Sequence, residues 1–281
     1  MNTPDRVAAA ELAKYDAVFV TGGSSGIGEA FLRGALEHSR ARVFNISRSA
    51  PSAGLSEIRE FVHIPCDLSD ASALDSLSAR VRGEISALGT SRPPRVLLVN
   101  NAGFGLYGEF PSPDVSRNMQ MIRLNVSALT RLCAEFLPAV KAGGGSIINV
   151  SSLAGFEPCP VLGVYAATKA YVKSFSLSLS YELGKHGCKC LCVCPGPTSS
   201  NFFKAAGFDE PPLAGGYGHE PAEVAAASYS ALARGRAIVV VGFWNSAVAL
   251  LARIAPTRLL LEISGRVLER VRRPRRAGKA T

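Results

Sequence analysis

The sequence reads Ala17-Val18-Phe19-Val20-Thr21-Gly22-Gly23-Ser24-Ser25-Gly26-Ile27-Gly28, and this stretch decides the fold. The apolar run 17–20 predicts a buried strand, and the pattern after the glycines, over 29–36, predicts a helix. Glycine permits a tight turn in which the backbone approaches a pyrophosphate, and a helix N-terminus offers unpaired N–H groups to phosphate oxygens. We therefore predict a dinucleotide site with contacts from Gly22, Ser24, Ser25, Gly26, Ile27 and Gly28, although the glycine spacing is Gly-x3-Gly-x-Gly.

The end of the next strand indicates which dinucleotide is bound. The strand pattern 42–46 runs into Ser47 and Arg48, and the sequence has no Asp or Glu from Val43 to Leu55. An NAD site usually has a carboxylate here for the ribose 2′-OH, whereas an NADP site has an arginine for the 2′-phosphate. Ser47 and Arg48 therefore favour NADP(H) over NAD(H). The alternative is that Arg48 is a solvated loop residue.

Tyr165 and Lys169 stand four residues apart, a spacing that puts both side chains on one face of a helix. A free tyrosine has a pKa of about 10. A cation beside it favours the phenolate and lowers that pKa, which would make Tyr165 a general acid/base. Taken alone, the pair is also compatible with an ordinary helix surface.

Ser152 follows the strand pattern 146–150 and precedes Tyr165 in the chain. It therefore lies at the C-terminal end of a strand, where open α/β sheets bind ligands. A hydroxyl there can donate to a substrate carbonyl oxygen as negative charge develops on it. Ser151 is the alternative, but neighbouring strand residues point to opposite faces, so only one of the two should reach the site.

With these residues the chain resembles the short-chain dehydrogenase/reductase family, in its compact single-domain branch, over about residues 15–242. The motifs that carry the resemblance occur in the family's order: Thr21-Gly22-x3-Gly26-x-Gly28, Cys66-Asp67-Leu68, Asn100-Asn101-Ala102-Gly103, Asn125, Ser152, Tyr165, Lys169 and Pro195-Gly196. The resemblance implies a Rossmann-type doubly wound parallel β-sheet of about seven strands, with helices on both faces. The alternation of strand and helix patterns favours the same α/β class.

The resemblance also implies roles for these residues. NADPH would deliver a hydride to a carbonyl carbon, Tyr165 would protonate the oxygen, and Ser152 would hydrogen-bond it. Lys169 would bind the nicotinamide ribose, and Asn125 would hold a water linking Lys169 to solvent. The remaining cofactor contacts would come from Asp67, Leu68, Asn101, Ala102, Gly103, Pro195 and Gly196. The family often has a threonine five residues after that proline; Ser200 stands there, so either Thr198 or Ser200 would supply the hydroxyl.

These features predict an NADP-dependent short-chain dehydrogenase/carbonyl reductase acting on CH–OH groups. The alternative is a catalytically idle NADP(H)-binding sensor or scaffold. Placed by the resemblance, apolar side chains surround the active-site mouth: Phe104, Leu106, Phe156, Leu162, Phe202 and Phe203. An apolar pocket suits a lipophilic carbonyl or alcohol, with Ser152, Tyr165, Phe104, Phe156 and Phe202 as substrate contacts. The glycine- and proline-rich stretch near 198–220 predicts a mobile lid, onto which these aromatics would otherwise pack.

The chain length and composition suit one large core. It has 281 residues, of which 47% are apolar, and does not demand a second domain. We expect an N-terminal extension at 1–14, a catalytic domain at 15–242, and a C-terminal apolar helix and basic tail at 243–281. Strands are expected near 16–21, 42–47, 61–65, 95–100, 146–151, 188–194 and 237–241, and helices near 27–38, 70–88, 114–141, 163–186 and 221–233.

Four of the seven cysteines alternate along one predicted strand, at 188, 190, 192 and 194. A straight strand does not fold ligands around a metal, so we interpret them as small buried residues and expect no metal site. Unpaired thiols suit a reducing cytosol. The N-terminus Met1–Asp5 lacks the apolar segment of a signal peptide, so we expect a cytoplasmic protein, peripheral to a membrane at most.

The formal charge of +9 is concentrated near the C-terminus, where seven basic residues stand against Glu269 between Arg266 and Lys279. We therefore expect no nucleic-acid partner. The apolar runs 243–252 and 259–263 fall short of the roughly 20 residues that a membrane span needs. They predict either a helix packed on the core or on a partner subunit, or a helix lying on an anionic membrane surface. The family resemblance implies a homodimer or homotetramer, paired through the long helices near 114–141 and 163–186.

Overall fold

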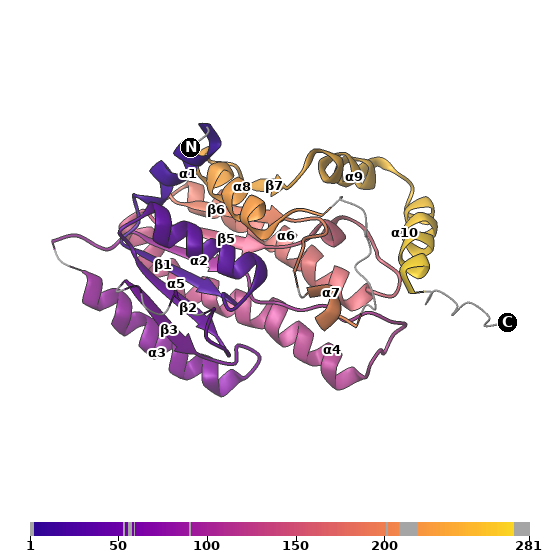
Figure 1. Ribbon diagram of the computed structural model, residues 1–281, viewed down its shortest axis with the longest axis horizontal. Helices are drawn as coiled ribbons and strands as arrows, with labels where there is room; N and C mark the ends of the chain where they lie inside the picture. The colour runs from indigo at the N-terminus through magenta and orange to yellow at the C-terminus, as the bar shows by residue number, and fades with distance from the viewer. Residues whose placement is uncertain are drawn as a thin grey trace.

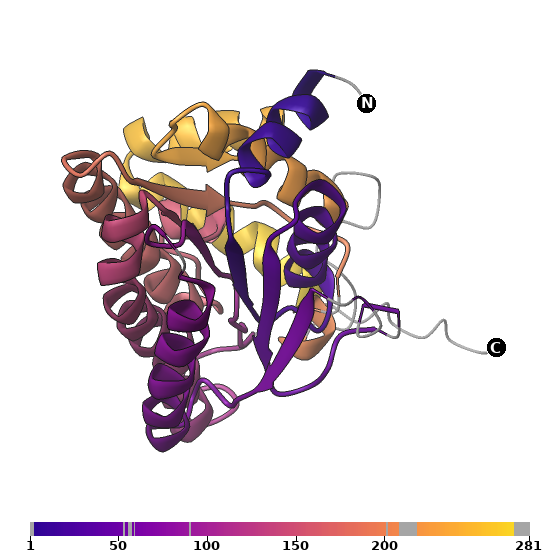
Figure 2. The same ribbon diagram turned by 90° about the vertical axis from the view of Figure 1, so that its left-hand side faces the viewer.

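Seven parallel strands form one sheet in the order β3-β2-β1-β4-β5-β6-β7. The computed structural model describes residues 3–52, 54–55, 58, 60–89, 91–200, 202–207 and 218–272. The strands are β1 (Ala17–Thr21), β2 (Arg42–Ser47), β3 (Phe61–Pro65), β4 (Val96–Asn100), β5 (Ser146–Val150), β6 (Lys189–Cys194) and β7 (Ile238–Val240). Helices cover both faces (Figure 1, Figure 2), so the predicted doubly wound Rossmann-type fold is confirmed.

One face of the sheet is covered by α1 (Thr3–Leu12), α2 (Gly26–His38) and α8 (Pro221–Ala233). Val18 and Val20 of β1 belong to this core. Across it, the Tyr229 hydroxyl donates a 2.8 Å hydrogen bond to the main-chain oxygen of Phe31, so a buried phenol ties α8 to α2.

The other face is covered by α3 (Ala71–Leu88), α5 (Leu129–Gly143) and α6 (Gly163–Gly184). Alternation along β1 turns Phe19 to this side. Its ring stacks on Phe44 with centroids 4.2 Å apart and meets the edge of Phe136 at 4.9 Å. Because both faces are buried, the strands appear in the sequence as continuous apolar runs, which is why they were predictable.

Helix α1 falls in the segment that we expected to be an N-terminal extension. It packs against α8, and Glu11 within it is 1% exposed. Glu11 accepts hydrogen bonds from Lys14 at 2.7 Å and from Lys189 of β6 at 3.0 Å. These contacts join α1 to the first residue of β6.

The helix expected near 114–141 is divided into α4 (Val115–Ile122), a π-helical turn η1 (Arg123–Ala128) and α5. Such turns insert an extra residue into a helix and often occur at functional sites. Here the turn carries Asn125, which is 1% exposed.

The C-terminal segment forms two helices, α9 (Phe243–Ile254) and α10 (Thr257–Arg272), where one apolar helix was expected. Pro256 lies between them, and proline cannot continue a helix because it lacks an N–H group. In the segment predicted as a lid, α7 (Phe202–Ala205) is a short helix, and Thr198 forms a β-bridge with His219. Residues 208–217 of that lid, the Phe203 side chain and the tail beyond Arg272 lie outside the described residues.

Candidate active site and cofactor crevice

The strand order reverses between β1 and β4, and an open α/β sheet has its ligand-binding crevice at the carboxyl ends of the strands at this point. Gly22, after β1, has φ +67°, a conformation that favours glycine. A Cβ on Gly28 would lie only 2.2 Å from the main-chain oxygen of Gly22. Ser25, which caps α2, makes no side-chain cap hydrogen bond. The first turn of α2 is thus a close-packed backbone cradle whose N–H groups suit phosphate oxygens.

Two side chains hold this cradle in place, that of Thr21 at the end of β1 and that of Asn101 directly after β4. Asn101 donates from Nδ2 to the main-chain oxygens of Thr21 at 3.0 Å and Gly22 at 3.2 Å. In return, Oγ1 of Thr21 accepts from the main-chain nitrogens of Asn101 at 2.9 Å and Ala102 at 3.0 Å. The glycine turn is therefore fixed to the end of β4.

Ser47 and Arg48 lie at the tip of β2, on the side of the crevice expected to hold the adenosine. The Arg48 side chain is exposed, while the Ser47 hydroxyl donates to the main-chain oxygen of Ser49 at 2.7 Å. Hydrogen bonds from Ser69 and the charge of Arg48 hold the pKa of Asp67 below its usual value, against partial burial. Arg48 and Asp67 therefore lie close enough for their charges to interact, and the next residue, Leu68, is buried.

Ser152 and Tyr165 meet at the carboxyl end of β5. The Ser152 hydroxyl accepts from Ala154 N at 3.2 Å, starts the short 3-10 turn η2 (Leu153–Phe156), and is hydrogen-bonded to the Tyr165 phenol. Ser151 instead donates to the main-chain oxygen of Lys169 at 2.7 Å. The two serines thus have different surroundings, and Ser152 is the one that reaches Tyr165.

The protonation of Tyr165 differs from the expectation. Burial raises its pKa to about 12, although the hydrogen bond with Ser152 lowers it in part. Lys169 does not bring this pKa down, because its Nζ lies 5.8 Å from the centre of the phenol ring and donates to Val150 O at 2.9 Å. Burial also lowers the pKa of Lys169 to about 8. The predicted depression of the Tyr165 pKa is therefore wrong for the protein's own side chains.

Asn125 connects two segments of the site through hydrogen bonds to Phe104 and Thr168. Its Oδ1 accepts from Phe104 N at 3.1 Å, and its Nδ2 donates to Phe104 O at 2.9 Å and to Thr168 Oγ1 at 3.1 Å. A Cβ on Gly103 would lie 2.9 Å from Asn125 Oδ1 and 3.4 Å from Lys169 Nζ. Asn125 therefore joins the loop after β4 to α6 beside Lys169, a contact that motif spacing alone did not reveal.

The turn after β6 closes the other side of the crevice. Pro195 O accepts from Leu153 N at 2.8 Å, and a Cβ on Gly196 would lie 2.3 Å from Asn245 Nδ2 of α9. Thr198 Oγ1 donates to Gly196 O at 3.1 Å. Ser200 lies across from the cradle, since a Cβ on Gly26 would be 3.2 Å from its Cβ. Of the two candidate hydroxyl residues, Ser200 is the one beside the glycine turn.

Apolar side chains surround Tyr165 on its open side. Leu106 and Met121 are buried with it, and Phe104 and Phe202 pack against the same cluster. The Tyr165 and Phe202 ring centroids are 5.3 Å apart. Phe156 is placed differently, with its ring 4.0 Å from Lys173 Nζ and 5.7 Å from the Arg253 guanidinium carbon. Leu162 belongs to a neighbouring cluster that also contacts Phe202.

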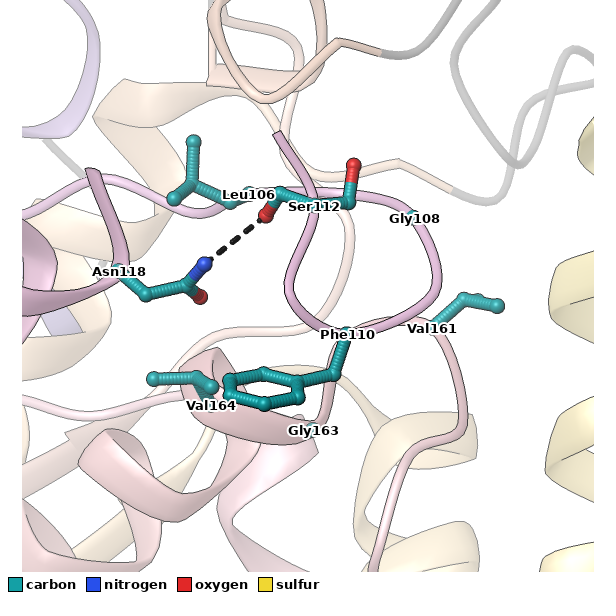
Figure 3. A pocket seen from close by; sticks show the side chains of 8 residues that line it. All are labelled: Leu106, Gly108, Phe110, Ser112, Asn118, Val161, Gly163 and Val164. Carbon is teal, nitrogen blue, oxygen red and sulfur yellow. Dashed lines mark hydrogen bonds between the residues drawn. The ribbon is translucent and has the colours of Figure 1, made fainter. Parts of the chain in front are cut away.

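A cavity of about 260 Å³ lies between the loop 106–112 and the start of α6 (Figure 3). Its lining comprises Leu106, Gly108, Phe110, Ser112, Asn118, Val161, Gly163 and Val164. Leu106 and Val164 also pack in the Tyr165 cluster, so the cavity adjoins that residue. Most of its lining was not predicted, because the loop follows no helix or strand period.

The cysteines of β6 are buried, as interpreted from the sequence. Across the described ranges, no three His, Cys, Asp or Glu side chains form a group that could hold a metal ion.

The family model of the short chain dehydrogenases matches residues 16–210. The chain belongs to this family. The "probable oxidoreductase EphD" of Mycobacterium tuberculosis is 31% identical over 201 residues, a match that covers 69% of this chain but only 33% of that protein. The chain thus spans about a third of the length of EphD.

Two further relatives match more of their own length. The 3-oxoacyl-[acyl-carrier-protein] reductase FabG of Chlamydia muridarum is 29% identical over 184 residues, covering 64% of this chain and 73% of the relative. A short-chain dehydrogenase from Sphingobium yanoikuyae, solved in complex with NADPH, is 26% identical with a TM-score of 0.72. That match covers 83% of this chain and 91% of the other.

Proposed function

We propose that this protein is an NADPH-dependent carbonyl reductase that interconverts a ketone or aldehyde with an alcohol and acts on lipophilic substrates. The observation that carries the proposal is the buried Tyr165 phenol, which is hydrogen-bonded to Ser152 and stands one helical turn from Lys169. These three groups lie where parallel sheets bind ligands, and Tyr165 belongs to an apolar cluster.

The residues present fit a nicotinamide dinucleotide. The Gly22–Gly28 cradle and the open first turn of α2 would take the pyrophosphate, and Lys169 would bind the nicotinamide ribose beside Gly103. The bound cofactor would supply the hydride. A Cβ at Gly28 or Gly103 would collide with other atoms of the protein, so both glycines are needed for the close packing of this part of the site.

The protein's own residues would supply the proton and hold the substrate oxygen in position to receive it. With a pKa of about 12, Tyr165 keeps its proton at neutral pH and can donate it to the substrate oxygen. The Ser152 hydroxyl would donate to the same oxygen as charge develops on it. Alcohol oxidation requires the Tyr165 phenol to lose its proton, so we expect reduction at neutral pH and oxidation at more alkaline pH.

Arg48 supports the choice of NADPH. Its exposed guanidinium stands at the tip of β2, where the sequence from 43 to 55 has no carboxylate for a ribose 2′-OH. Asp67, whose carboxylate accepts from Ser69 at 2.7 and 2.9 Å, stands near Arg48 and would contact the adenine. The Sphingobium yanoikuyae relative was solved with NADPH, which supports the same preference.

The apolar surroundings of Tyr165 support a lipophilic substrate. Phe104, Leu106 and Phe202 line its open side, and the adjoining cavity is lined largely by apolar residues. A charged metabolite would lose its hydration there without a partner of opposite charge among the lining residues that the structure describes.

The test is NADPH oxidation, followed by absorbance, across methyl ketones and 3-keto esters of graded chain length, with small charged keto acids as the comparison. We expect kcat/KM to rise with chain length and the keto acids to be poor substrates. NADPH binding without turnover on any member of the panel would favour the alternative, a cofactor-binding sensor or scaffold.

A further inference from the structure

The apolar side of α9 faces outward. Ala249 is its buried residue, and Asn245 and Arg253 lie on the same inward side, one turn before and one turn after it. The large apolar residues occupy the opposite arc of the helix: Phe243 (80% exposed), Trp244 (72%), Leu250 (60%), Leu251 (58%), Ile254 (73%) and Val248 (42%). A surface helix normally buries its apolar stripe, so α9 has the reverse orientation.

Helix α10 continues this surface. Its inward side is anchored, because Ser264 donates to Pro158 O at 3.2 Å and Leu268 O accepts from the Tyr107 hydroxyl at 2.9 Å. On its outward side, Leu259, Ile263 and Val267 recur every four residues and are all about half exposed. Both helices lie at the same end of the molecule (Figure 1). We call the outward residues of α9 and α10 the C-terminal apolar face.

Cations border this face. Arg258 and Arg266 of α10 are exposed, and Arg266 lies 3.5 Å from Glu262. The sequence that follows is more basic still, with Arg270, Arg272, Arg273, Arg275, Arg276 and Lys279 against Glu269. Apolar helix faces with bordering arginines bind anionic lipid surfaces, and tryptophan and phenylalanine favour the boundary between acyl chains and headgroups.

We propose that the C-terminal apolar face docks this protein onto an anionic lipid bilayer. Charge decides between a bilayer and a second copy of the chain. A symmetric pair joined through this face would bring its arginines together, whereas phosphate headgroups neutralise them. Among the described residues, no helix is long and apolar enough to cross a membrane, so the contact is with the bilayer surface.

Docking in this orientation brings the substrate side of the site toward the lipid. Leu268 of α10 packs in the cluster that contains Leu162 and Phe202, and Phe202 also packs against Tyr165. A lipophilic carbonyl dissolved in the bilayer would therefore have a short path to the site. The docking inference does not rest on the proposed reaction, since its test needs no turnover.

Trp244 is the sole tryptophan of the sequence and lies on the proposed contact surface, so it reports docking directly. The full chain is titrated with vesicles of phosphatidylglycerol and phosphatidylcholine, or of phosphatidylcholine alone, at low salt. We expect a blue shift of tryptophan emission and co-sedimentation with the anionic vesicles. Binding should be at least about tenfold weaker to the neutral vesicles, and weaker in high salt.

Variants separate the apolar part from the charge. Leu251→Asp with Ile254→Asp keeps Trp244 and should weaken vesicle binding at least about tenfold. Ser76→Asp with Ala79→Asp, which adds the same charge at exposed positions of α3, should leave binding unchanged. Arg258→Glu with Arg266→Glu leaves the apolar residues in place and should weaken binding to anionic vesicles only. Thermal unfolding verifies that each variant is folded.

Either of two results would overturn the proposal. One is the absence of any emission shift or co-sedimentation with anionic vesicles. The other is a blue shift that grows with protein concentration in the absence of lipid, which would show that the face pairs with a second copy.

Discussion

Lys169 Nζ donates a 2.9 Å hydrogen bond to the main-chain oxygen of Val150, the last residue of β5. This bond fixes the ammonium at the end of the strand, 5.8 Å from the centre of the Tyr165 ring. Burial favours the neutral form of each group. It lowers the pKa of Lys169 to about 8 and raises the pKa of Tyr165 to about 12. At neutral pH the phenol is therefore firmly protonated, while the lysine is close to losing its charge.

The Lys169 pKa predicts a pH-dependent cofactor affinity. The lysine is charged below pH about 8, so NADPH affinity should be highest there and should fall as the pH rises through that value. Lys169→Met should bind NADPH more weakly with no such fall, whereas Lys173→Met, one turn further along α6, should keep it. Titration of NADPH fluorescence at a series of pH values measures both, and a flat wild-type profile would contradict the assignment.

Tyr165→Phe should remove the proton donor and leave the cofactor site intact. We expect turnover to fall by about 10² to 10⁴, with NADPH affinity within about threefold of wild type. Tyr171→Phe is the matched control, because its hydroxyl lies on the same helix but pairs with Thr130 Oγ1 at 3.0 Å. Steady-state kinetics and NADPH titration distinguish the two variants. Retention of full turnover in Tyr165→Phe would rule out Tyr165 as the acid.

Arg48→Ala should weaken NADPH binding and spare NADH binding. Loss of a charge-assisted hydrogen bond to the 2′-phosphate costs about 1.5 to 3 kcal/mol, which is roughly a ten- to hundredfold change in affinity. Arg82→Ala, which removes a surface arginine paired with Glu135 at 2.6 Å, is the control. Equal affinity of the wild type for NADPH and NADH would show that the preference is wrong.

The Glu11 carboxylate predicts how stability depends on pH. Burial raises its pKa, but hydrogen bonds from Lys14 and Lys189 outweigh burial and hold the pKa below its ordinary value. Its stabilisation is therefore present above the unfolded-state pKa of about 4.3 and is lost as the pH falls through the lower folded-state pKa. Glu11→Gln should cost about 3 kcal/mol at neutral pH and flatten this acid limb.

Thermal unfolding across pH measures the Glu11 effect. Glu182→Gln changes an exposed carboxylate on α6 and should follow the wild type. A Glu11→Gln variant with wild-type stability at neutral pH would mean that the contact with Lys189 contributes nothing.

The fold was predictable because its strands are buried on both sides. Ala17–Thr21 and Val96–Asn100 are continuous apolar runs, and the glycine turn after the first of them leads directly into α2. The π-helical turn at Asn125 was not predictable, because one inserted residue barely disturbs the apolar period of a long helix. The contact between Glu11 of α1 and Lys189 joins residues far apart in the sequence, so it was not predictable either.

The residues of the site were predictable from the sequence, but the pKa of Tyr165 was not. Motif spacing identified Ser152, Tyr165 and Lys169, and the structure brings them to one end of the sheet. The pKa of Tyr165 depends on how deeply the phenol is buried, which local sequence does not specify. In α9, periodicity shows which side chains share a side of the helix, but only tertiary packing shows that this side faces outward.

The contact between Gly196 and Asn245 has a consequence for engineering. Asn245 occupies the space where a side chain at 196 would stand, and its Nδ2 also donates to Val241 O at 2.7 Å. Truncation of the chain before α9 would leave the turn after β6 without this support and Val241 O without its donor. Helices α9 and α10 therefore cannot be removed without affecting the turn after β6. Chimeras with related proteins should exchange this turn and the two helices together.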